Sequence, residues 1–175
     1  MDIRKLELSD QEAYRRYEAA MLSDKQGNPF VELEFVEDLE QAILDGQQSE
    51  VKQAGQTWSP YSTYYGFIDN EIVGMVRCFW EADNSTVLDL GEVGYMVHPH
   101  YRWQGIAQAL LAFALDLFEK KGYEKVSVAT DRDNLPSRGL IKKMGGQLES
   151  IRQIHYFGQS MLAAKYWIYL GKENT

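Results

Sequence analysis

The chain has 175 residues, 45% of them hydrophobic and 13% aromatic, which suits one domain with a sizeable core and excludes long disorder. Its formal net charge of −8 excludes a general binder of nucleic-acid backbones, because such binders need a basic face. No apolar run reaches the roughly 18 residues of a membrane span, and the single Cys78 cannot form an internal disulfide. We therefore expect one cytoplasmic domain over 1–175, with no membrane or nucleic acid among its partners.

The N-terminal part of the chain is predicted to be mainly helical. A short strand is expected over 2–8. A helix should begin at Ser9, where Glu12 three residues later completes a capping-box pattern, and should run to about Met21. A second helix is predicted over 36–44, before a polar loop.

An acidic segment spans 26–51 and contains no lysine or arginine. Its seven acids are Glu32, Glu34, Glu37, Asp38, Glu40, Asp45 and Glu50. A run of this kind is usually a solvated helix face. The alternative is a flank that attracts a cationic ligand, and the sequence leaves both interpretations open.

Strand patterns follow the helices. Residues 64–68 and 72–80 are predicted to form a hairpin around the turn residues Asp69 and Asn70, because both runs are rich in β-branched and aromatic side chains. A third strand, interrupted by glycines, is predicted over 88–97.

The rest of the chain alternates helices and strands. The strongest helix is predicted over 104–121, where apolar residues recur at the helical period, and a strand should follow over 125–130. Pro136 suits the first turn of another helix, and two last strands are expected over 147–156 and 163–170. The sum is an α/β chain with an α+β mixed sheet, one parallel strand–helix–strand crossover and helices on its faces.

The segment 97–107 joins the third predicted strand to the long helix. The first N–H groups of a helix have no acceptor within it, and they point along the positive end of the helix dipole. Such a site suits a pyrophosphate. Gly105 lets the chain approach phosphate oxygens, Ala107 is small, and Arg102 is placed for charge-assisted contacts. The chain contains neither G-x-x-x-x-G-K-[ST] nor G-x-G-x-x-G, which disfavours other phosphate loops.

The pattern Arg102-x-x-Gly105-x-Ala107 resembles the R/Q-x-x-G-x-G/A acetyl-CoA signature of the GNAT superfamily of N-acetyltransferases. The resemblance covers 88–146 and extends to an N-x-x-S…K-x-G stretch that begins at Asn134. Within the superfamily the chain looks like a group of bacterial predicted acetyltransferases. The resemblance implies the GNAT fold, with a mostly antiparallel central sheet and helices on both faces. It also implies that acetyl-CoA is the acyl donor and that no metal is needed.

The resemblance also implies roles for individual residues. The backbone of Met96 and Val97 would hold the pantetheine arm, and a backbone N–H near Met96 would bind the oxyanion. The pyrophosphate would be held by Arg102, Trp103, Gln104, Gly105, Ile106 and Ala107. Asn134 and Ser137 would contact the cofactor's far side, and Lys143 its phosphates. Three of these residues have structural alternatives: Arg102 as a solvated surface residue, Gly105 as a packing glycine, and Lys143 as a cation at a helix C-terminus.

The catalytic groups are less well specified. Many GNAT members have a tyrosine that protonates the leaving thiolate where this chain has Ile141. Tyr95, Tyr156 and Tyr166 are candidate replacements, although a tyrosine in a strand is more often part of the packing. Glu92, on the strand that leads to the cofactor turn, is the candidate general base, with an ordinary strand carboxylate as the alternative.

Two other features carry weaker indications. His98 and His100 lack a third metal ligand, and Cys78 has no evident histidine partner for an acyl-carrier role.

The resemblance predicts that the protein transfers an acetyl group from acetyl-CoA by direct attack of an amine acceptor. The acidic segment suggests that this acceptor is a cationic small molecule or a peptide amine. The alternatives are a non-catalytic acyl-CoA sensor, supported by Ile141, and a structural interaction domain with an anion pocket. A homodimer is possible.

Overall fold

The computed structural model describes residues 1–82, 84–156 and 158–171. The strands in this part are β1 (Asp2–Arg4), β2 (Tyr61–Ile68), β3 (Glu71–Phe79), β4 (Val93–Val97), β5 (Lys125–Asp131), β6 (Gln147–Tyr156) and β7 (Gln159–Tyr169). The helices are α1 (Gln11–Lys25), α2 (Leu39–Gln48), α3 (Ser85–Leu90), α4 (Ile106–Lys120) and α5 (Leu135–Lys143), with short 3₁₀ turns at Leu8–Asp10 and Pro99–Tyr101.

All of these strands form one sheet in the order β1-β2-β3-β4-β5-β7-β6. The β4–β5 pair is parallel and the other pairs are antiparallel, which confirms the mixed sheet with one parallel crossover. The hairpin between β2 and β3 turns at Asp69 and Asn70, whose positive φ angles of 48° and 63° suit the twist of a two-residue turn.

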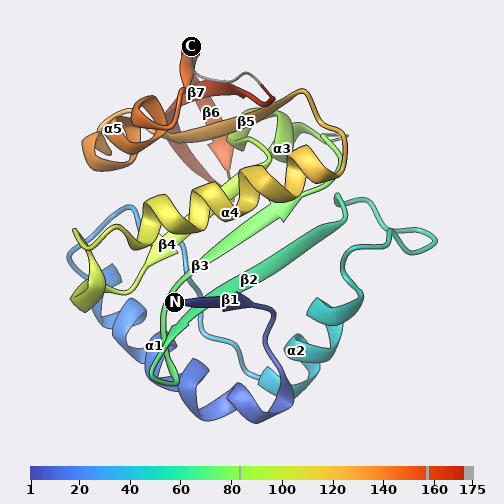
Figure 1. The fold of residues 1–175 in the computed structure, drawn as a ribbon, viewed down its shortest axis with the longest axis vertical. Helices are drawn as coiled ribbons and strands as arrows, with labels where there is room; N and C mark the ends of the chain where they lie inside the picture. The colour runs from blue at the N-terminus through green and yellow to red at the C-terminus, as the bar shows by residue number, and fades with distance from the viewer. Residues whose placement is uncertain (83, 157, 172–175) are drawn as a thin grey trace.

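Helices cover both faces of the sheet (Figure 1). On one face, α4 packs across β3 and β4, and one core cluster joins α4 and Ile141 of α5 to the sheet. On the other face, α1 and α2 cover β2 and β3 around a second cluster that includes Tyr17 and Met75. The central part of the sheet is therefore buried on both sides, and its strand ends are left to border a site.

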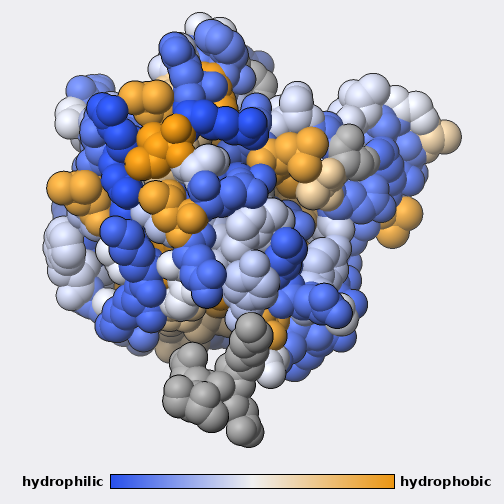
Figure 2. Space-filling view, turned by 90° about the horizontal axis from the view of Figure 1, so that it is seen from above, coloured by the Kyte–Doolittle hydropathy of each residue, from blue (hydrophilic) through white to orange (hydrophobic). Residues whose placement is uncertain are grey.

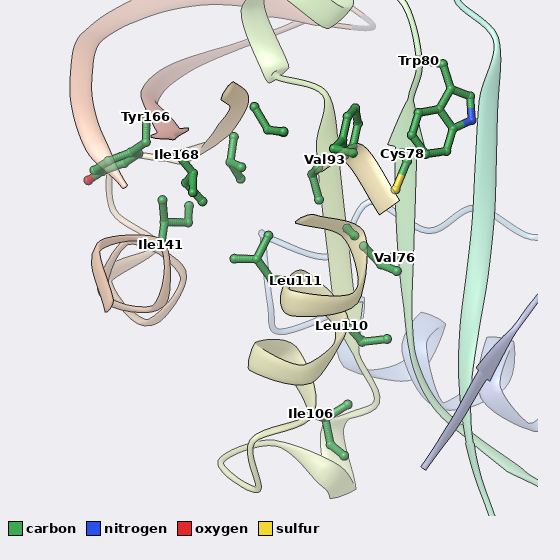
Figure 3. Close-up of a cluster of buried hydrophobic side chains, with 14 of the residues drawn as sticks. Val76, Cys78, Trp80, Val93, Ile106, Leu110, Leu111, Ile141, Tyr166 and Ile168 are labelled. Atoms are coloured by element: carbon green, nitrogen blue, oxygen red, sulfur yellow. The ribbon is translucent and has the colours of Figure 1, made fainter. Parts of the chain in front are cut away.

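The apolar stripe of α4 forms the centre of the larger core. Leu110 and Leu111 are completely buried, and Figure 3 shows them between the sheet and Ile141. Ile141 is equally buried, and a Cβ on Gly146 would lie only 2.5 Å from its Cγ2. Position 141 is thus a packed core position.

The third predicted strand is wrong in its first half, because residues 85–90 form α3. The side chain of Asn84 accepts a hydrogen bond from the Val87 N–H and caps this helix. Gly91 then adopts a φ of +87°, and a Cβ there would lie 2.8 Å from the Ser127 carbonyl oxygen. The strand begins only at Val93, after this close approach.

Other boundaries also differ from the prediction. Ser9 is not the helix cap: Glu7 caps the 3₁₀ turn in a capping box with Asp10, and α1 continues to Lys25. The helix predicted over 36–44 begins three residues later, at Leu39, because Asp38 caps it.

The outer edge of the sheet is formed by β6. Its residues Leu148 and Ile151 are 49% and 40% exposed. Figure 2 views this end of the molecule and shows apolar side chains in separate groups among polar ones. An edge strand of this kind can pair with a second copy, so the homodimer stays a prediction. None of the helices in the described ranges has the length and apolarity to cross a bilayer.

Candidate functional site

Strands β4 and β5 touch at one point and then diverge. Val93 and Val128 are their only paired residues in the described structure, whereas β4 pairs with β3 along its whole length. The edge of β4 from Gly94 to Val97 therefore has no strand partner on the β5 side. This opening is bordered by extended backbone with unused hydrogen-bonding groups, which suits an arm that adds like a strand.

The hydrogen-bond pattern decides which backbone groups face the opening. The Phe79 N–H donates to the Glu92 carbonyl, and the His98 N–H donates to the Val73 carbonyl. Because an antiparallel ladder alternates, Gly94 and Met96 direct their backbone groups to β3. The N–H and C=O groups of Tyr95 and Val97 face the opening instead. The backbone groups of Met96 are thus bonded within the sheet and those of Val97 are not, and the cofactor contacts expected of both residues stay predictions.

The turn before α4 presents a run of free amide groups. Within the described structure the N–H groups of residues 102–108 donate to no protein acceptor, and the first bond of the helix runs from Ala109 to Gly105. Gly105 has a φ of +81°, and a Cβ there would meet no heavy atom within 4 Å. No side chain of the described residues fills this turn, so its N–H groups and the helix dipole are available to an anion.

Two side chains of the turn point away from its N–H groups. Arg102 donates to the Asp24 carboxylate at 2.7 Å and so ties the turn to the end of α1. This bond lowers the pKa of Asp24. Trp103 is 87% exposed and has a φ of +62°, an unusual conformation for a bulky residue. Strain of this kind is typical of functional turns.

The far side of the opening is formed by the start of α5. Asn134 caps this helix by accepting from the Ser137 N–H at 3.3 Å. The hydroxyl oxygens of Ser137 and Tyr95 lie 2.8 Å apart, so the Tyr95 side chain reaches from β4 to α5. Burial raises the pKa of Tyr95, which keeps its phenol protonated at neutral pH.

Lys143 lies close to the first turn of α4. Its Nζ donates to the side chain of Gln108 at 2.8 Å. The ammonium group is therefore near the free N–H groups of the turn, where a cation would add to the attraction for phosphate. Ile106 and Ala107 lie in the same first turn, so the sequence-predicted phosphate residues are gathered at one end of α4.

Glu92 lies where β4 joins β5. It is 7% exposed, and its Oε2 accepts from the N–H and the hydroxyl of Ser127 at 2.7 and 3.1 Å. Its Oε1 accepts from no described residue. One oxygen of the carboxylate thus completes the irregular junction of the two strands, and the catalytic role expected of Glu92 stays a prediction.

The remaining tyrosine candidates have other partners. Tyr166 is completely buried, and its hydroxyl accepts from Arg138 at 2.8 Å. Tyr156 ends β6 and hydrogen-bonds the Glu32 carboxylate. Of the three tyrosines, Tyr95 is the one whose hydroxyl contacts another sequence-predicted site residue.

The histidines and the cysteine have structural surroundings. The Nδ1 of His98 accepts from the His100 N–H, and the described residues contain no group of three or more His, Cys, Asp or Glu side chains suited to a metal. Cys78 is fully buried, and burial raises the pKa of its thiol to about 12. A thiol of this kind is not a nucleophile at neutral pH.

Most acids of the acidic segment have local hydrogen-bond partners, and two of them pair with lysines. Glu34 pairs with Lys25, Asp38 caps α2, Asp45 accepts from Gln41, and Glu50 pairs with Lys5. Glu32 is the acid of this segment that hydrogen-bonds the β6–β7 hairpin, and burial raises its pKa. Most of the negative charge is thus explained by a folded, solvated surface.

A cavity of about 170 Å³ lies beneath α2, on the face opposite α4. Sequence reasoning missed it, and with it the half-buried Arg77 of β3, whose guanidinium lines it. The signal was a single charged residue within the otherwise uncharged strand 72–80. Arg77 pairs with Gly94 of β4, so this cavity adjoins the strand that borders the opening.

Comparison with known proteins agrees with this geometry. Residues 28–146 match the sequence profile described as the Acetyltransferase (GNAT) family. A streptothricin acetyltransferase from Escherichia coli is 30% identical over 108 residues, which are 59% of this chain and 59% of that protein. A Bacillus subtilis (strain 168) protein, whose name proposes a ribosomal protein bS18-alanine N-acetyltransferase, is 25% identical over 63% of this chain and 70% of its own length. The solved structure of RimL, a ribosomal L7/L12 α-N-protein acetyltransferase in complex with coenzyme A, superposes with a TM-score of 0.68 at 16% identity, covering 95% of this chain and 92% of that one.

Proposed function

The chain belongs to the GNAT acetyltransferase family, and from this membership we propose that it transfers the acetyl group of acetyl-CoA to a primary amine by direct attack in a ternary complex. The observation that carries the proposal is the run of free N–H groups at 102–108, set at the end of the opening between β4 and β5. A diphosphate bound there would place the pantetheine arm along β4, with the thioester toward Val93.

The reaction needs three events. The neutral amine nitrogen attacks the thioester carbon, the carbon–sulfur bond breaks, and the thiolate takes up a proton while the new amide nitrogen loses one. Holding both reactants in one complex supplies much of the rate. The Tyr95 N–H, which faces the opening on the Val93 side, would stabilise the oxyanion.

Tyr95 is the proposed proton donor to the thiolate. Its phenol is protonated at neutral pH, borders the opening and is oriented by the hydroxyl of Ser137. It approaches from β4, whereas the position usual in the family is the packed Ile141 of α5. The interpretation as a sensor depends on the absence of a tyrosine at position 141. The phenol of Tyr95 would donate the proton that the leaving thiolate needs, so this absence does not exclude catalysis.

Glu92 is the proposed base. Its free Oε1 would accept the amine proton through a water molecule, since the carboxylate is buried at the strand junction. The acidic segment predicted a cationic acceptor. Because most acids of that segment have local partners, we propose no positive charge on the acceptor other than that of its reacting ammonium group.

The test is thiol release from acetyl-CoA in the presence of a panel of amines, together with calorimetry of CoA binding. Turnover that requires both acetyl-CoA and an amine, with the product acetylated on nitrogen, supports the proposal. CoA binding without turnover on any amine would favour a sensor. Absence of CoA binding would overturn the site itself.

A further inference from the structure

Arg77 is a half-buried cation without a counter-ion among the described residues. Its Nε donates to Thr63 Oγ1 at 2.9 Å, and its guanidinium carbon lies 5.1 Å from the centre of the Tyr61 ring. Within the described ranges no hydrogen bond or ion pair engages its two terminal nitrogens. Arginine donates from five N–H groups in a fixed fork, so the four N–H groups of the two terminal nitrogens remain for a ligand.

The groups that face Arg77 do not neutralise its charge. It interacts electrostatically with the hydroxyls of Tyr14, Tyr65 and Tyr156, which come from α1, β2 and β6. All three phenols have raised pKa values because of burial, so they are neutral at pH 7. A partly desolvated charge without a partner is unfavourable, and it is typical of a site whose partner is a ligand.

The cavity beside Arg77 contains no carboxylate among its described lining residues. Its charged residues are Arg77 and Lys5, and Lys5 is paired with Glu50 at 2.8 Å. The rest of the lining is mainly aliphatic and aromatic, with Leu39 and Ile43 from α2. Drug-sized ligands need about 300–1,000 Å³. A cavity of about 170 Å³ suits a single branched or aromatic side chain.

Arg77 joins the cavity to the strand along which acetyl transfer would occur, because it lines the cavity and pairs with Gly94 of β4. Gly94 is directly opposite Arg77 in the β3–β4 ladder, so both side-chain directions lead to the same face of the sheet. Gly94 is exposed, and a Cβ there would have no atom within 4 Å. The space directly over Gly94 is therefore open on the face of the sheet to which Arg77 is directed.

From this arrangement we infer that Arg77 binds the carboxylate of the acetyl acceptor, and that the acceptor is a small α-amino acid with an apolar side chain. The inference rests on the proposed acetyltransferase function. The terminal nitrogens of Arg77 form a bidentate pair with the carboxylate. The side chain enters the cavity beneath α2, and the α-amino group lies over Gly94, facing the thioester. A polyamine would place positive charge against Arg77, which has no counter-ion among the described residues.

The test compares each amino acid with the same molecule without its carboxylate. L-leucine and L-phenylalanine are measured against leucinamide and phenylalaninamide, and against the polyamine spermidine. We expect kcat/KM for the amino acids to exceed that for the amides by about 100-fold. The amides lack the negative charge that pairs with Arg77, and loss of one partner of a buried charge pair has an effect of about this size. Equal rates for acids and amides in the unaltered protein would overturn the inference, and so would a preference for spermidine.

A variant separates binding by Arg77 from a structural role. Arg77→Gln should lower kcat/KM for leucine by about 100-fold and leave the amide unchanged, so the preference disappears. The matched control is Lys5→Gln, which removes the other cation of the cavity and should keep the preference because Glu50 already neutralises Lys5. A drop of equal size for acid and amide in Arg77→Gln would contradict the inference.

The outcomes also distinguish this inference from the function on which it rests. If amines are acetylated without regard to the carboxylate, the function stands and the inference falls. If no compound of the panel is acetylated while CoA binds, both fall. If Arg77→Gln does not fold, the comparison of acids with amides in the unaltered protein still decides.

Discussion

Replacing Gly105 with glutamate should abolish CoA binding and leave the fold intact. Gly105 has a φ of +81°, where a residue with a side chain costs about 1–2 kcal/mol. For a chain of this length, such a cost lowers Tm by about 2–8 °C. The new carboxylate would lie beside the bound diphosphate. At a separation of about 5 Å and an effective dielectric constant of about 20, each pair of unit charges repels by about 3 kcal/mol. The affinity should therefore fall by at least about 100-fold.

The chain offers a matched control at the other end of the same helix. Gly122 has a φ of +86° and, like Gly105, no atom within 4 Å of a Cβ. Gly122→Glu therefore has the same backbone strain, and its charge lies at the negative end of the helix dipole, which adds about 0.3–1 kcal/mol of cost. It should be the less stable variant and bind CoA normally. Calorimetry with CoA and thermal unfolding measure both effects. Wild-type affinity in Gly105→Glu, or an equal loss in Gly122→Glu, would refute the reasoning.

The other predictions concern the catalytic groups, the buried thiol and pH. Tyr95→Phe should lower kcat by about 10²-fold or more with unchanged CoA affinity, as for removal of a general acid, and an unchanged kcat measured by thiol release would remove Tyr95 from the mechanism. Glu92→Gln should slow turnover at constant CoA affinity, and an unaltered rate would leave Glu92 with its structural role alone. Cys78, with a thiol pKa of about 12, should resist alkylation at pH 8 until the protein unfolds, and rapid labelling of the native protein would contradict its burial. The pKa of Asp24 is lowered by Arg102, so its stabilising effect is present above the unfolded pKa of about 3.9 and is lost as pH falls through the folded value. Asp24→Asn should accordingly lower Tm at pH 7 and have little effect on Tm near pH 2, and an equal change of Tm at both pH values would contradict this linkage.

The parts of the fold that the sequence predicts well have strong local signals. The apolar stripe of α4 and the turn at Asp69 and Asn70 specify their own conformation, because helical periodicity and left-handed turn residues act over a few positions. The turn before α4 is predicted for the same reason, since Gly105 and the helix start are adjacent in sequence, while its binding of the cofactor stays a prediction.

The parts that escaped prediction depend on tertiary contacts. Residues 88–90 are predicted as the start of a strand, but they belong to α3, because Asn84 caps this helix and Gly91 approaches Ser127. The sequence marks Arg77 only as a lone charge in an uncharged strand, because the lack of a partner for its terminal nitrogens among the described residues is a tertiary feature. The bond between Tyr95 and Ser137 likewise joins residues 42 positions apart.

The most direct measurement is the amide ¹H–¹⁵N spectrum of the protein during titration with CoA, with pantetheine as the control ligand that lacks phosphate. We predict that the amide resonances of residues 102–108 move strongly with CoA, because these free N–H groups bind the diphosphate, and that pantetheine leaves them in place. Resonances of this turn that stay unmoved at saturating CoA, or that move equally with pantetheine, would contradict the account.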